Sequence, residues 1–274
     1  MNLYITDLDK TFLHSDLSVS EYSKEIWNEA LKQGHIISVA TARSLKKSLD
    51  FLQGLEFKAP LILLDGAMVA MADGKVVSLH ALEYALSQEI IEYGRKLHSI
   101  EPFIVGIDKE GEMERFLYPA TLNIYQQQLI SSYKNDNRLR AITAIEPLKQ
   151  NLKIVYMGSK EEMCFFEEEL IKRFGSSIHI KNAPDVYFDC YFLTVLHPLG
   201  DKAHALDDVM EYMDIEKEKL VTFGDNHNDI EMFKKAHKGV AVANAVEELK
   251  TIADVVLPHS NDEDGVAHYI KGCL

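Results

Sequence analysis

The sequence has few of the features that mark disulfide-stabilised or membrane-spanning proteins. Only three cysteines occur in 274 residues, and Cys164, Cys190 and Cys273 are too scattered for a disulfide framework or a zinc site. No apolar run approaches the roughly 20 residues that cross a bilayer. The N-terminus lacks the basic flank and long apolar stretch of a signal peptide. We therefore expect a cytoplasmic protein with reduced thiols.

Basic residues are also scarce. The chain has 29 Lys and Arg against 43 Asp and Glu, which gives a formal net charge of -14. Nucleic acids and anionic membranes bind faces rich in Lys and Arg, so we expect neither as a partner. An anionic substrate would need a local cation, either a bound metal ion or a few converging basic side chains. The sequence gives no indication of oligomeric state.

Apolar residues, by contrast, are plentiful, and their pattern predicts an α/β fold. They make up 47% of the chain, with only seven prolines, so a sizeable core can form. Ser18 and Glu21 predict a capping box for a helix that ends near Gly34. Strands are expected at 2–6, 35–40 and 60–64, a second helix at 44–55 and a hairpin at 69–77. This β-α-β-α-β order predicts a parallel sheet with helices on both faces.

The order of elements changes in the middle of the chain, which indicates an inserted domain. Helices are expected at 87–98, 122–134 and 160–174. Strands are expected at 103–107, 113–117, 152–157 and 177–181, the first two joined across 108–111. This mixture predicts an α+β insert with a largely antiparallel sheet. Alternation resumes after Pro198, so we predict a core of 1–81 and 191–274 and an inserted domain of 82–190.

Two aspartates follow the first predicted strand directly, in Asp7-Leu8-Asp9-Lys10-Thr11. A carboxylate at the end of a buried parallel strand lies where α/β sheets place reactive groups. A second carboxylate nearby can serve as the acid/base partner of a nucleophile. Taken alone, the motif also fits an Asp-rich turn that closes a strand.

Two further features follow the same pattern. Thr41-Ala42-Arg43 ends the second predicted strand, where a hydroxyl and the amides of a helix N-terminus favour an anion. The alternative is that Thr41 only caps the following helix. Lys202 begins a helix after the turn at 198–201, and by itself it would be an ordinary surface residue.

The last loop, Gly224-Asp225-Asn226-His227-Asn228-Asp229, gathers several oxygen ligands at a strand end. Hard oxygen donors without a cysteine cluster select Mg²⁺ rather than zinc, and Mg²⁺ commonly bridges carboxylates and a phosphate. The alternative is that Asp225 forms a turn while Asn228 and Asp229 cap the next helix. His227 is expected to be a loop or surface residue.

Together these four motifs, in this order, resemble the haloacid dehalogenase-like hydrolase superfamily. The similarity is greatest to its Cof-type phosphatase branch, which carries a large inserted α/β cap of the C2B type. The resemblance covers essentially the whole chain, with supporting likenesses at Asp65-Gly66-Ala67 and Asn244-Ala245. It implies a Rossmann-like parallel-sheet core and an inserted cap that contributes to substrate specificity.

The resemblance also implies roles for the acidic residues. Asp7 would attack phosphorus to give an aspartyl-phosphate, and Asp9 would protonate the departing alcohol and then deprotonate water. Mg²⁺ would be held by Asp7, the backbone carbonyl of Asp9 and Asp225. Asp229 would also belong to the metal site, either as a further ligand or, as we expect, in contact with the ligands rather than with the ion.

The phosphate-binding residues are implied in the same way. Thr41 and Lys202 would bind the oxygens of the transferring phosphoryl group, together with the segment of Ala42 and Arg43. Asn228 would contact phosphate or substrate. A metal ion, a lysine, a hydroxyl and backbone amides suit phosphoryl transfer, which depends mainly on positioning and charge stabilisation.

Three positions depart from the usual pattern of the family. Lys10 stands where glycine or another small residue is common, Ala42 replaces a glycine, and Asp65 replaces an asparagine. The Lys10 side chain must then point outward or add charge near the site, and Asp65 adds negative charge near a phosphate. None of the three removes a reacting group.

The resemblance implies a Mg²⁺-dependent phosphatase of small phosphorylated metabolites such as sugar phosphates. One alternative is a sugar phosphomutase, whose second phosphate would be held by arginines of the insert: Arg95, Arg115, Arg138, Arg140 and Arg173. Another is a non-catalytic binding protein, against which the Asp7 and Asp9 pair argues. The substrate is not identified, and the segments near 182–185 and Glu110 are candidates to contact it.

Overall fold

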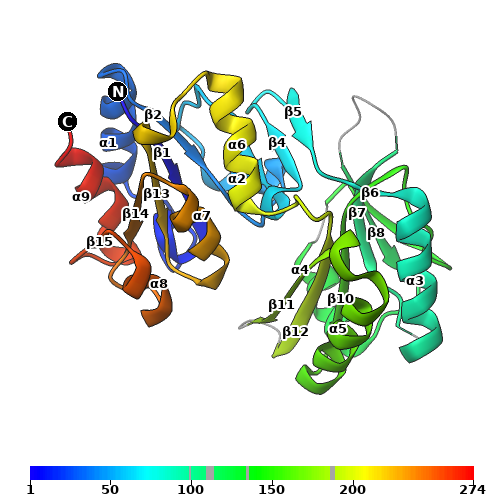
Figure 1. Cartoon of the computed structure of the whole chain (residues 1–274). Helices are drawn as coiled ribbons and strands as arrows, with labels where there is room; N and C mark the ends of the chain where they lie inside the picture. The colour runs from blue at the N-terminus through cyan, green and yellow to red at the C-terminus, as the bar shows by residue number, and fades with distance from the viewer. Residues whose placement is uncertain (99, 109–113, 134–135, 186–188) are drawn as a thin grey trace. The chain divides into compact units, whose positions relative to one another are not determined.

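The computed structural model describes residues 1–274 except 99, 109–113, 134–135 and 186–188 (Figure 1). The chain forms two compact units, one of Met1–Leu79 with Asp201–Leu274 and the other of His80–Gly200. The expected turn at 108–111, the start of the strand at 113–117 and the candidate Glu110 fall largely outside the described residues. Among the described helices, none has the length and apolarity to cross a membrane.

The first unit is built on a parallel sheet of five short strands in the order β15-β14-β13-β1-β2. Their bounds are β1 Leu3–Thr6, β2 Ile36–Val39, β13 Leu220–Gly224, β14 Lys238–Ala241 and β15 Val255–Val256. The strands that follow the insert therefore pair directly with those that precede it. The predicted Rossmann-like parallel core is confirmed.

Helices cover both faces of this sheet, as predicted. Leu3 and Ile5 of β1 pack with Leu206 of α6 (Lys202–Met213) and Met232 of α7 (Ile230–Lys235). Alternate residues of a strand point to opposite faces, and Phe223 of β13 instead meets Tyr269 of α9 (Gly265–Lys271). Figure 1 shows α9 beside α1 (Glu21–Lys32), with the sheet between them and α6 and α7.

The third predicted strand does not extend the parallel sheet. β3 (Leu61–Leu63) pairs antiparallel with β4 (Met68–Ala70), which pairs with β5 (Val76–Leu79) in a separate three-stranded sheet. A single parallel bridge between Ala40 and Ile62 joins β3 to the end of β2. The third strand therefore meets the parallel sheet only at this bridge, and a tight turn at Leu64–Gly66 then sends the chain back along β3.

The predicted capping box is also wrong. Ser20, not Ser18, caps α1, since its side-chain oxygen accepts from the Ser23 amide at 2.9 Å. Ser18 lies in the preceding loop, where its amide donates to Asp16 Oδ1 at 2.9 Å and its carbonyl accepts from the His14 amide. This local turn occupies Ser18 and moves the helix start two residues onward.

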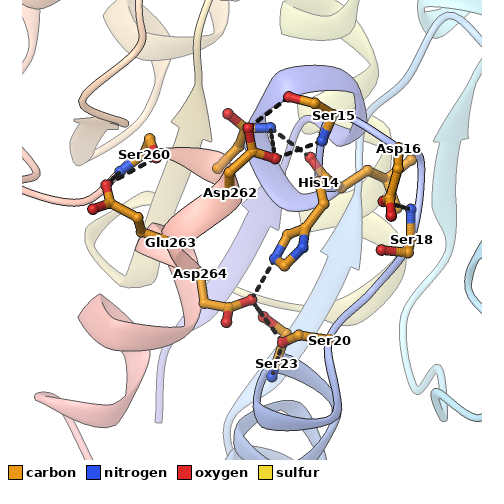
Figure 2. A network of polar contacts seen from close by, with 12 residues as sticks. His14, Ser15, Asp16, Ser18, Ser20, Ser23, Ser260, Asp262, Glu263 and Asp264 are labelled. Carbon is orange, nitrogen blue, oxygen red and sulfur yellow. Dashed lines mark hydrogen bonds and ion pairs between the residues drawn. The ribbon is translucent and has the colours of Figure 1, made fainter.

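A polar network ties this loop to the far end of the chain (Figure 2). One carboxylate oxygen of Asp264 accepts from Ser20 Oγ at 2.7 Å and from Ser23 Oγ at 2.8 Å, and it lies 2.9 Å from His14 Nε2. Ser15 contacts the neighbouring Asp262 through its amide and hydroxyl. The loop that follows β1 is thereby held against the segment that begins α9.

The second unit is an α+β domain with a largely antiparallel sheet, as predicted. The strand order is β11-β12-β10-β7-β8-β9, with β6 on β10, and among the described strands only β8 and β9 are parallel neighbours. Its strands are β6 Leu82–Glu83, β7 Phe103–Ile107, β8 Arg115–Pro119, β9 Leu139–Ile142, β10 Gln150–Gly158, β11 His179–Asp185 and β12 Cys190–Leu196. α3 (Tyr84–His98) and α5 (Lys160–Phe174) pack on one face, and α4 (Ile124–Ser132) packs on the other.

The end of the insert differs from the predicted boundary at residue 190. β12 pairs with both β10 and β11, with Tyr191 opposite Gly158 and Pro184. The segment that we expected to return to the core therefore belongs to the second unit, which runs His80–Gly200. The remaining helices of the first unit are α2 (Leu45–Phe51) and α8 (Glu247–Ile252).

Candidate active site

The register of the parallel sheet brings three of the predicted motifs to one edge. Thr6 at the end of β1 lies opposite Val39 of β2 and Phe223 of β13. The Asp7 amide continues the ladder by donating to the Phe223 carbonyl at 3.0 Å, and the Ala40 amide donates to the Thr6 carbonyl at 2.9 Å. Loops that follow adjacent parallel strands leave the sheet at the same edge. The loops of Asp7, Thr41 and Asp225 are therefore neighbours.

Lys202 comes from a distant part of the chain and lies at the centre of this edge. Only 1% of its surface is exposed, and its Nζ lies 2.5 Å from Asp7 Oδ1 and 2.8 Å from Asp229 Oδ1. Lys202 is the first residue of α6, whose start is capped by the side chain of Asp201. The alternative of an ordinary surface lysine is wrong.

Gly66 allows α6 to begin this close to the strand ends. Its φ of +106° suits glycine, and a Cβ added here would lie 2.2 Å from the Asp201 carbonyl oxygen. No other residue could occupy this position without moving the backbone immediately before Lys202. Gly66 of the Asp65-Gly66-Ala67 segment, which supports the family resemblance, thus has a physical role, because it leaves room for the start of α6.

The turn after β13 orients Asp225 through Asp229. Asp229 Oδ2 accepts from the amides of Asp225 at 3.1 Å and Asn226 at 3.2 Å, while its Oδ1 faces Lys202. Both Asp229 oxygens are thus engaged by the protein. Asp225 Oδ1 accepts from Thr11 Oγ1 at 3.2 Å, a contact between the first and last motifs that their sequences did not predict.

Burial and mutual repulsion shift the proton affinities of these groups. Burial, assisted by the charges of Asp229 and Asp225, raises the pKa of Asp7 well above its ordinary value despite the opposing Lys202. Burial and the Asp229 charge raise the pKa of Asp225 to about 6. Burial alone would lower the pKa of Lys202, but the carboxylates of Asp229 and Asp7 raise it above the ordinary value. The lysine therefore remains an ammonium ion.

The carboxylates fit a divalent cation. Asp7, Asp225 and Asp229 each offer an oxygen, and these atoms lie within 4.8 Å of one another. Lys202 balances only one of three buried negative charges, and burial together with the repulsion between the carboxylates raises the pKa of both Asp7 and Asp225. Carboxylate oxygens suit a hard ion such as Mg²⁺ or Ca²⁺. Asp7 and Asp225 are the better ligands, because both oxygens of Asp229 already have partners.

Thr41 is buried beside this cluster and does not cap α2. Ser44 is the cap of that helix, with its side chain accepting from the Lys47 amide. The Thr41 hydroxyl instead accepts from the Arg43 amide at 3.1 Å, and its carbonyl accepts from the Asp65 amide at 3.0 Å. A hydroxyl that accepts one hydrogen bond can still donate another.

Asp9 and Arg43 form an ion pair that the sequence did not predict. Arg43 Nε lies 2.8 Å from Asp9 Oδ2, and Arg43 Nη2 contacts Asp9 Oδ1. The Asp9 side chain is 43% exposed, in contrast to the buried Asp7. The two aspartates of the first motif therefore have different environments and different basic partners.

The turn that carries Asp7 and Asp9 is fixed by Asn244. The backbone of Lys10 has a left-handed φ of 58°, and its carbonyl accepts from Asn244 Nδ2 at 2.8 Å. Asn244 Oδ1 in turn accepts from the Asn261 amide at 2.9 Å. The Lys10 side chain points to solvent, and its charge lowers the pKa of Asp225 slightly against the effect of burial.

Two of the predicted phosphate-binding residues lie on the exposed surface. Asn228 is exposed in the turn His227–Asp229, and Ala42 is exposed between Thr41 and Arg43. His227 is also exposed, as expected for a loop residue. The contacts of Asn228 and Ala42 with a phosphate stay predictions.

Comparison with known proteins places these features in a wider context. A family model described as haloacid dehalogenase-like hydrolase matches residues 4–270. A 5-amino-6-(5-phospho-D-ribitylamino)uracil phosphatase of Bacillus subtilis is 24% identical, over 98% of this chain and 96% of its own length. An HMP-PP phosphatase of Serratia proteamaculans is also 24% identical, over 98% and 93%.

A solved structure extends the similarity to three dimensions. The crystal structure of a Thermotoga maritima protein matches with a TM-score of 0.79 and 25% identity, covering 99% of this chain and 97% of its own. All the candidate site residues fall within residues 4–270, the part of the chain that the family model matches.

Proposed function

This chain belongs to the haloacid dehalogenase-like hydrolase family, and from that premise we propose that it is a phosphatase of small phosphorylated metabolites. The observation that carries the proposal is the buried lysine that bridges two carboxylates at the sheet edge. Lys202 contacts Asp7 and Asp229 there, beside the third carboxylate of Asp225. A nucleophile for phosphoryl transfer needs such local positive charge in order to approach an anion.

In the proposed reaction, the Asp7 carboxylate attacks the phosphorus and the bond to the alcohol oxygen breaks. Asp9 gives its proton to that oxygen, so a neutral alcohol leaves and an aspartyl-phosphate remains on Asp7. Asp9 then takes a proton from a water molecule that attacks the same phosphorus. The bond to Asp7 breaks, inorganic phosphate departs and both carboxyl groups regain their starting forms.

Lys202 and Thr41 would hold the transferring group. Lys202 offers a fixed charge beside Asp7, and it is kept in place by Asp229. Thr41, buried at the end of the neighbouring strand, offers a hydroxyl donor. These groups stabilise charge that develops on phosphoryl oxygens without having to rearrange.

We propose Mg²⁺ as the metal, bound by Asp7, Asp225 and the backbone carbonyl of Asp9. When bound, Mg²⁺ favours the ionised carboxylates and reduces the repulsion between Asp7 and a phosphoryl anion. Asp229 would orient this site through its contacts with Lys202 and the amides of Asp225 and Asn226.

The environment of the insert's arginines favours a hydrolase over a phosphomutase. Arg138 is buried against Glu114 and Asp136, and Arg95 pairs with Glu101. The other three also have protein partners, which are Asp108 for Arg115, backbone carbonyls for Arg140, and Glu89 with the ring of Tyr93 for Arg173. A second phosphate would have to displace these partners.

The relatives support a proposal for the substrate class. Those named above are phosphatases of a ribityl-aminouracil phosphate and of HMP-PP, so we propose phosphorylated metabolites of similar size, sugar phosphates included. The test is a screen of the purified protein with Mg²⁺ against sugar phosphates, nucleotides and cofactor phosphates, with released phosphate as the readout. Turnover that disappears in excess EDTA and in Asp7→Asn supports the proposal. No turnover on any phosphate ester would contradict it.

A further inference from the structure

The ion pair between Asp9 and Arg43 joins a candidate acid/base to a candidate phosphate ligand. Both carboxylate oxygens of Asp9 accept from the guanidinium, Oδ2 from Nε at 2.8 Å and Oδ1 from Nη2. Asp9 is 43% exposed at its side chain, so little packing restricts its rotation. A two-point contact with a planar guanidinium fixes the plane of a carboxylate in a way that a single contact does not.

Arg43 is itself held from several sides. Its guanidinium carbon lies 4.6 Å above the centre of the Phe51 ring, which is part of α2. Its amide donates to Thr41 Oγ1 at 3.1 Å, and its carbonyl accepts from the Leu64 amide at 3.0 Å. Stacking on Phe51 therefore restrains the guanidinium, and the backbone hydrogen bonds fix the main chain of Arg43. Both restraints hold the guanidinium in position for Asp9.

The geometry points to Arg43 as a positioning residue that orients the Asp9 carboxyl group for proton transfer, and not as a ligand of the transferring phosphoryl group. The inference rests on the proposed function, in which Asp9 is the acid/base. It departs from the sequence-based expectation that Arg43 binds phosphate. Lys202, buried against Asp7, is the cation placed to meet the phosphoryl group.

The ion pair is compatible with proton transfer at Asp9. A carboxylate has about four lone-pair positions on its two oxygens, and Arg43 occupies one on each. The remaining positions can carry a proton to the leaving oxygen or receive one from water. Without Arg43, the half-exposed side chain of Asp9 would sample other rotamers. The rate of proton transfer would then fall with the fraction of molecules whose Asp9 carboxyl group faces the reacting oxygen.

Two variants separate orientation from charge. Arg43→Lys keeps a positive charge but offers a point donor in place of the planar fork, whereas Arg43→Met removes the charge and keeps the apolar stem. Each would be assayed in single turnover, as the rate of alcohol release with Mg²⁺. The substrates are 4-nitrophenyl phosphate, whose leaving group needs little protonation, and an alkyl phosphate that the wild type hydrolyses, whose leaving group needs it fully. The inhibition constant of inorganic phosphate reports anion binding.

We expect both variants to release the alkyl alcohol about 10-fold to 100-fold more slowly and 4-nitrophenol less than about 3-fold more slowly. The inhibition constant of phosphate should stay within about 2-fold of wild type in Arg43→Lys. Arg173→Met is the matched control, since Arg173 also lies over aromatic rings and near a carboxylate, at Glu89. It should leave both rates unchanged.

The inference is overturned if the two substrates slow equally, or if Arg43→Lys keeps the wild-type alkyl rate. It is also overturned if Arg43→Lys weakens phosphate inhibition 10-fold or more, because Arg43 would then be an anion ligand. A thermal unfolding midpoint close to wild type shows that the variants are folded. If the wild type hydrolyses no phosphate ester, the proposed function itself has failed, which is a separate outcome.

Discussion

The ammonium group of Lys202 lies 2.5 Å from Asp7 Oδ1, although 195 residues separate the two in sequence. This contact joins the end of the first strand of the core to the first turn of α6, the helix that follows the insert. Both side chains are buried, so each depends on the other for compensation of its charge. We therefore expect this pair of residues to contribute both to the stability of the fold and to the proposed reaction.

Replacing Lys202 with methionine should lower both stability and activity. Without the ammonium, Asp7 and Asp229 would be two buried carboxylates without their shared cation. We expect the free energy of unfolding at neutral pH to fall by about 3 to 5 kcal/mol, and kcat on an aryl phosphate to fall by at least about 100-fold.

Urea unfolding and steady-state assays provide the two readings. Lys250→Met is the control, because Lys250 pairs with Glu247 on the exposed surface of α8 and such pairs contribute little. If Lys202→Met were as stable and as active as Lys250→Met, the contacts of Lys202 with Asp7 and Asp229 would contribute to neither stability nor activity.

Gly66→Ala should be far more disruptive than Gly74→Ala. Both glycines have a positive φ, 106° and 91°, but an added Cβ meets the Asp201 carbonyl oxygen at 2.2 Å only at Gly66, while Gly74 has open space. Backbone strain is common to both and costs about 1 kcal/mol. The collision adds to it at Gly66 and shifts the residue before Lys202.

The comparison of the two alanine variants therefore isolates the collision. We expect Gly66→Ala to be about 2 kcal/mol less stable than Gly74→Ala and to lose activity that Gly74→Ala keeps. If the two variants had equal unfolding free energies and equal activities, α6 would be able to shift away from residue 66 without loss of stability or activity, and the prediction would be wrong.

Asp264 should make stability depend on acid pH. Burial alone would raise its pKa, but contacts from Ser20, His14 and Ser23 (Figure 2) lower the pKa below the ordinary value. A carboxylate with a lowered pKa stabilises the fold above its unfolded pKa, and that stabilisation disappears as pH falls through the folded value. The loss should therefore occur below about pH 4.

Asp264→Asn removes the charge and tolerates the left-handed backbone of this residue, where φ is 56°. We expect it to lower the unfolding free energy at pH 7 by about 1 to 2 kcal/mol, and we expect this difference from wild type to shrink as the pH falls below about 4. Asp207→Asn, at an exposed ion pair with Lys235, should show no such convergence. Denaturant titrations at several pH values make the test, and a constant offset for Asp264→Asn would contradict it.

Asp225→Asn should stabilise the metal-free protein while abolishing its response to Mg²⁺. The raised pKa of Asp225, about 6, means that its charged form is unfavourable in the fold at pH 7. A neutral amide should therefore add about 1 to 3 kcal/mol. Wild type should gain about 2.7 kcal/mol when Mg²⁺ is present at 100 times its Kd.

Thermal unfolding in EDTA measures the stability change without metal, and thermal unfolding in MgCl₂ measures the stabilisation by Mg²⁺. The control is Asp50→Asn, at an exposed residue. We expect MgCl₂ to raise the unfolding free energy of wild type and of the Asp50→Asn control by the same amount. If MgCl₂ stabilised Asp225→Asn as much as it stabilises wild type, Asp225 would not be a metal ligand.

Much of the core could be predicted from the sequence because its signals are local. A short apolar strand followed at once by Asp7 and Asp9 is visible in a few residues, and so is the Gly224–Asp229 turn. Parallel pairing then forces these loops to one sheet edge. The insert's antiparallel character likewise followed from the order of its elements.

What could not be predicted depended on contacts between distant residues. No spacing indicated that Arg43 would meet Asp9, or that Thr11 would donate to Asp225. β9 was missed because Arg140 interrupts its apolar pattern. β12 was missed because its apolar run lies where we placed the boundary, and only its pairing with β10 and β11 assigns it to the insert.

The most direct test of the central claim is acid-quenched trapping of phosphate on the protein. With 4-nitrophenyl phosphate labelled at phosphorus and Mg²⁺ present, Asp9→Asn should accumulate label, because this leaving group needs little protonation while the group that activates water for the second step is missing. The label should map to the peptide that contains Asp7 and should be absent from Asp7→Asn. Label that persists in Asp7→Asn, or that maps to another residue, would contradict the assignment of Asp7 as the nucleophile.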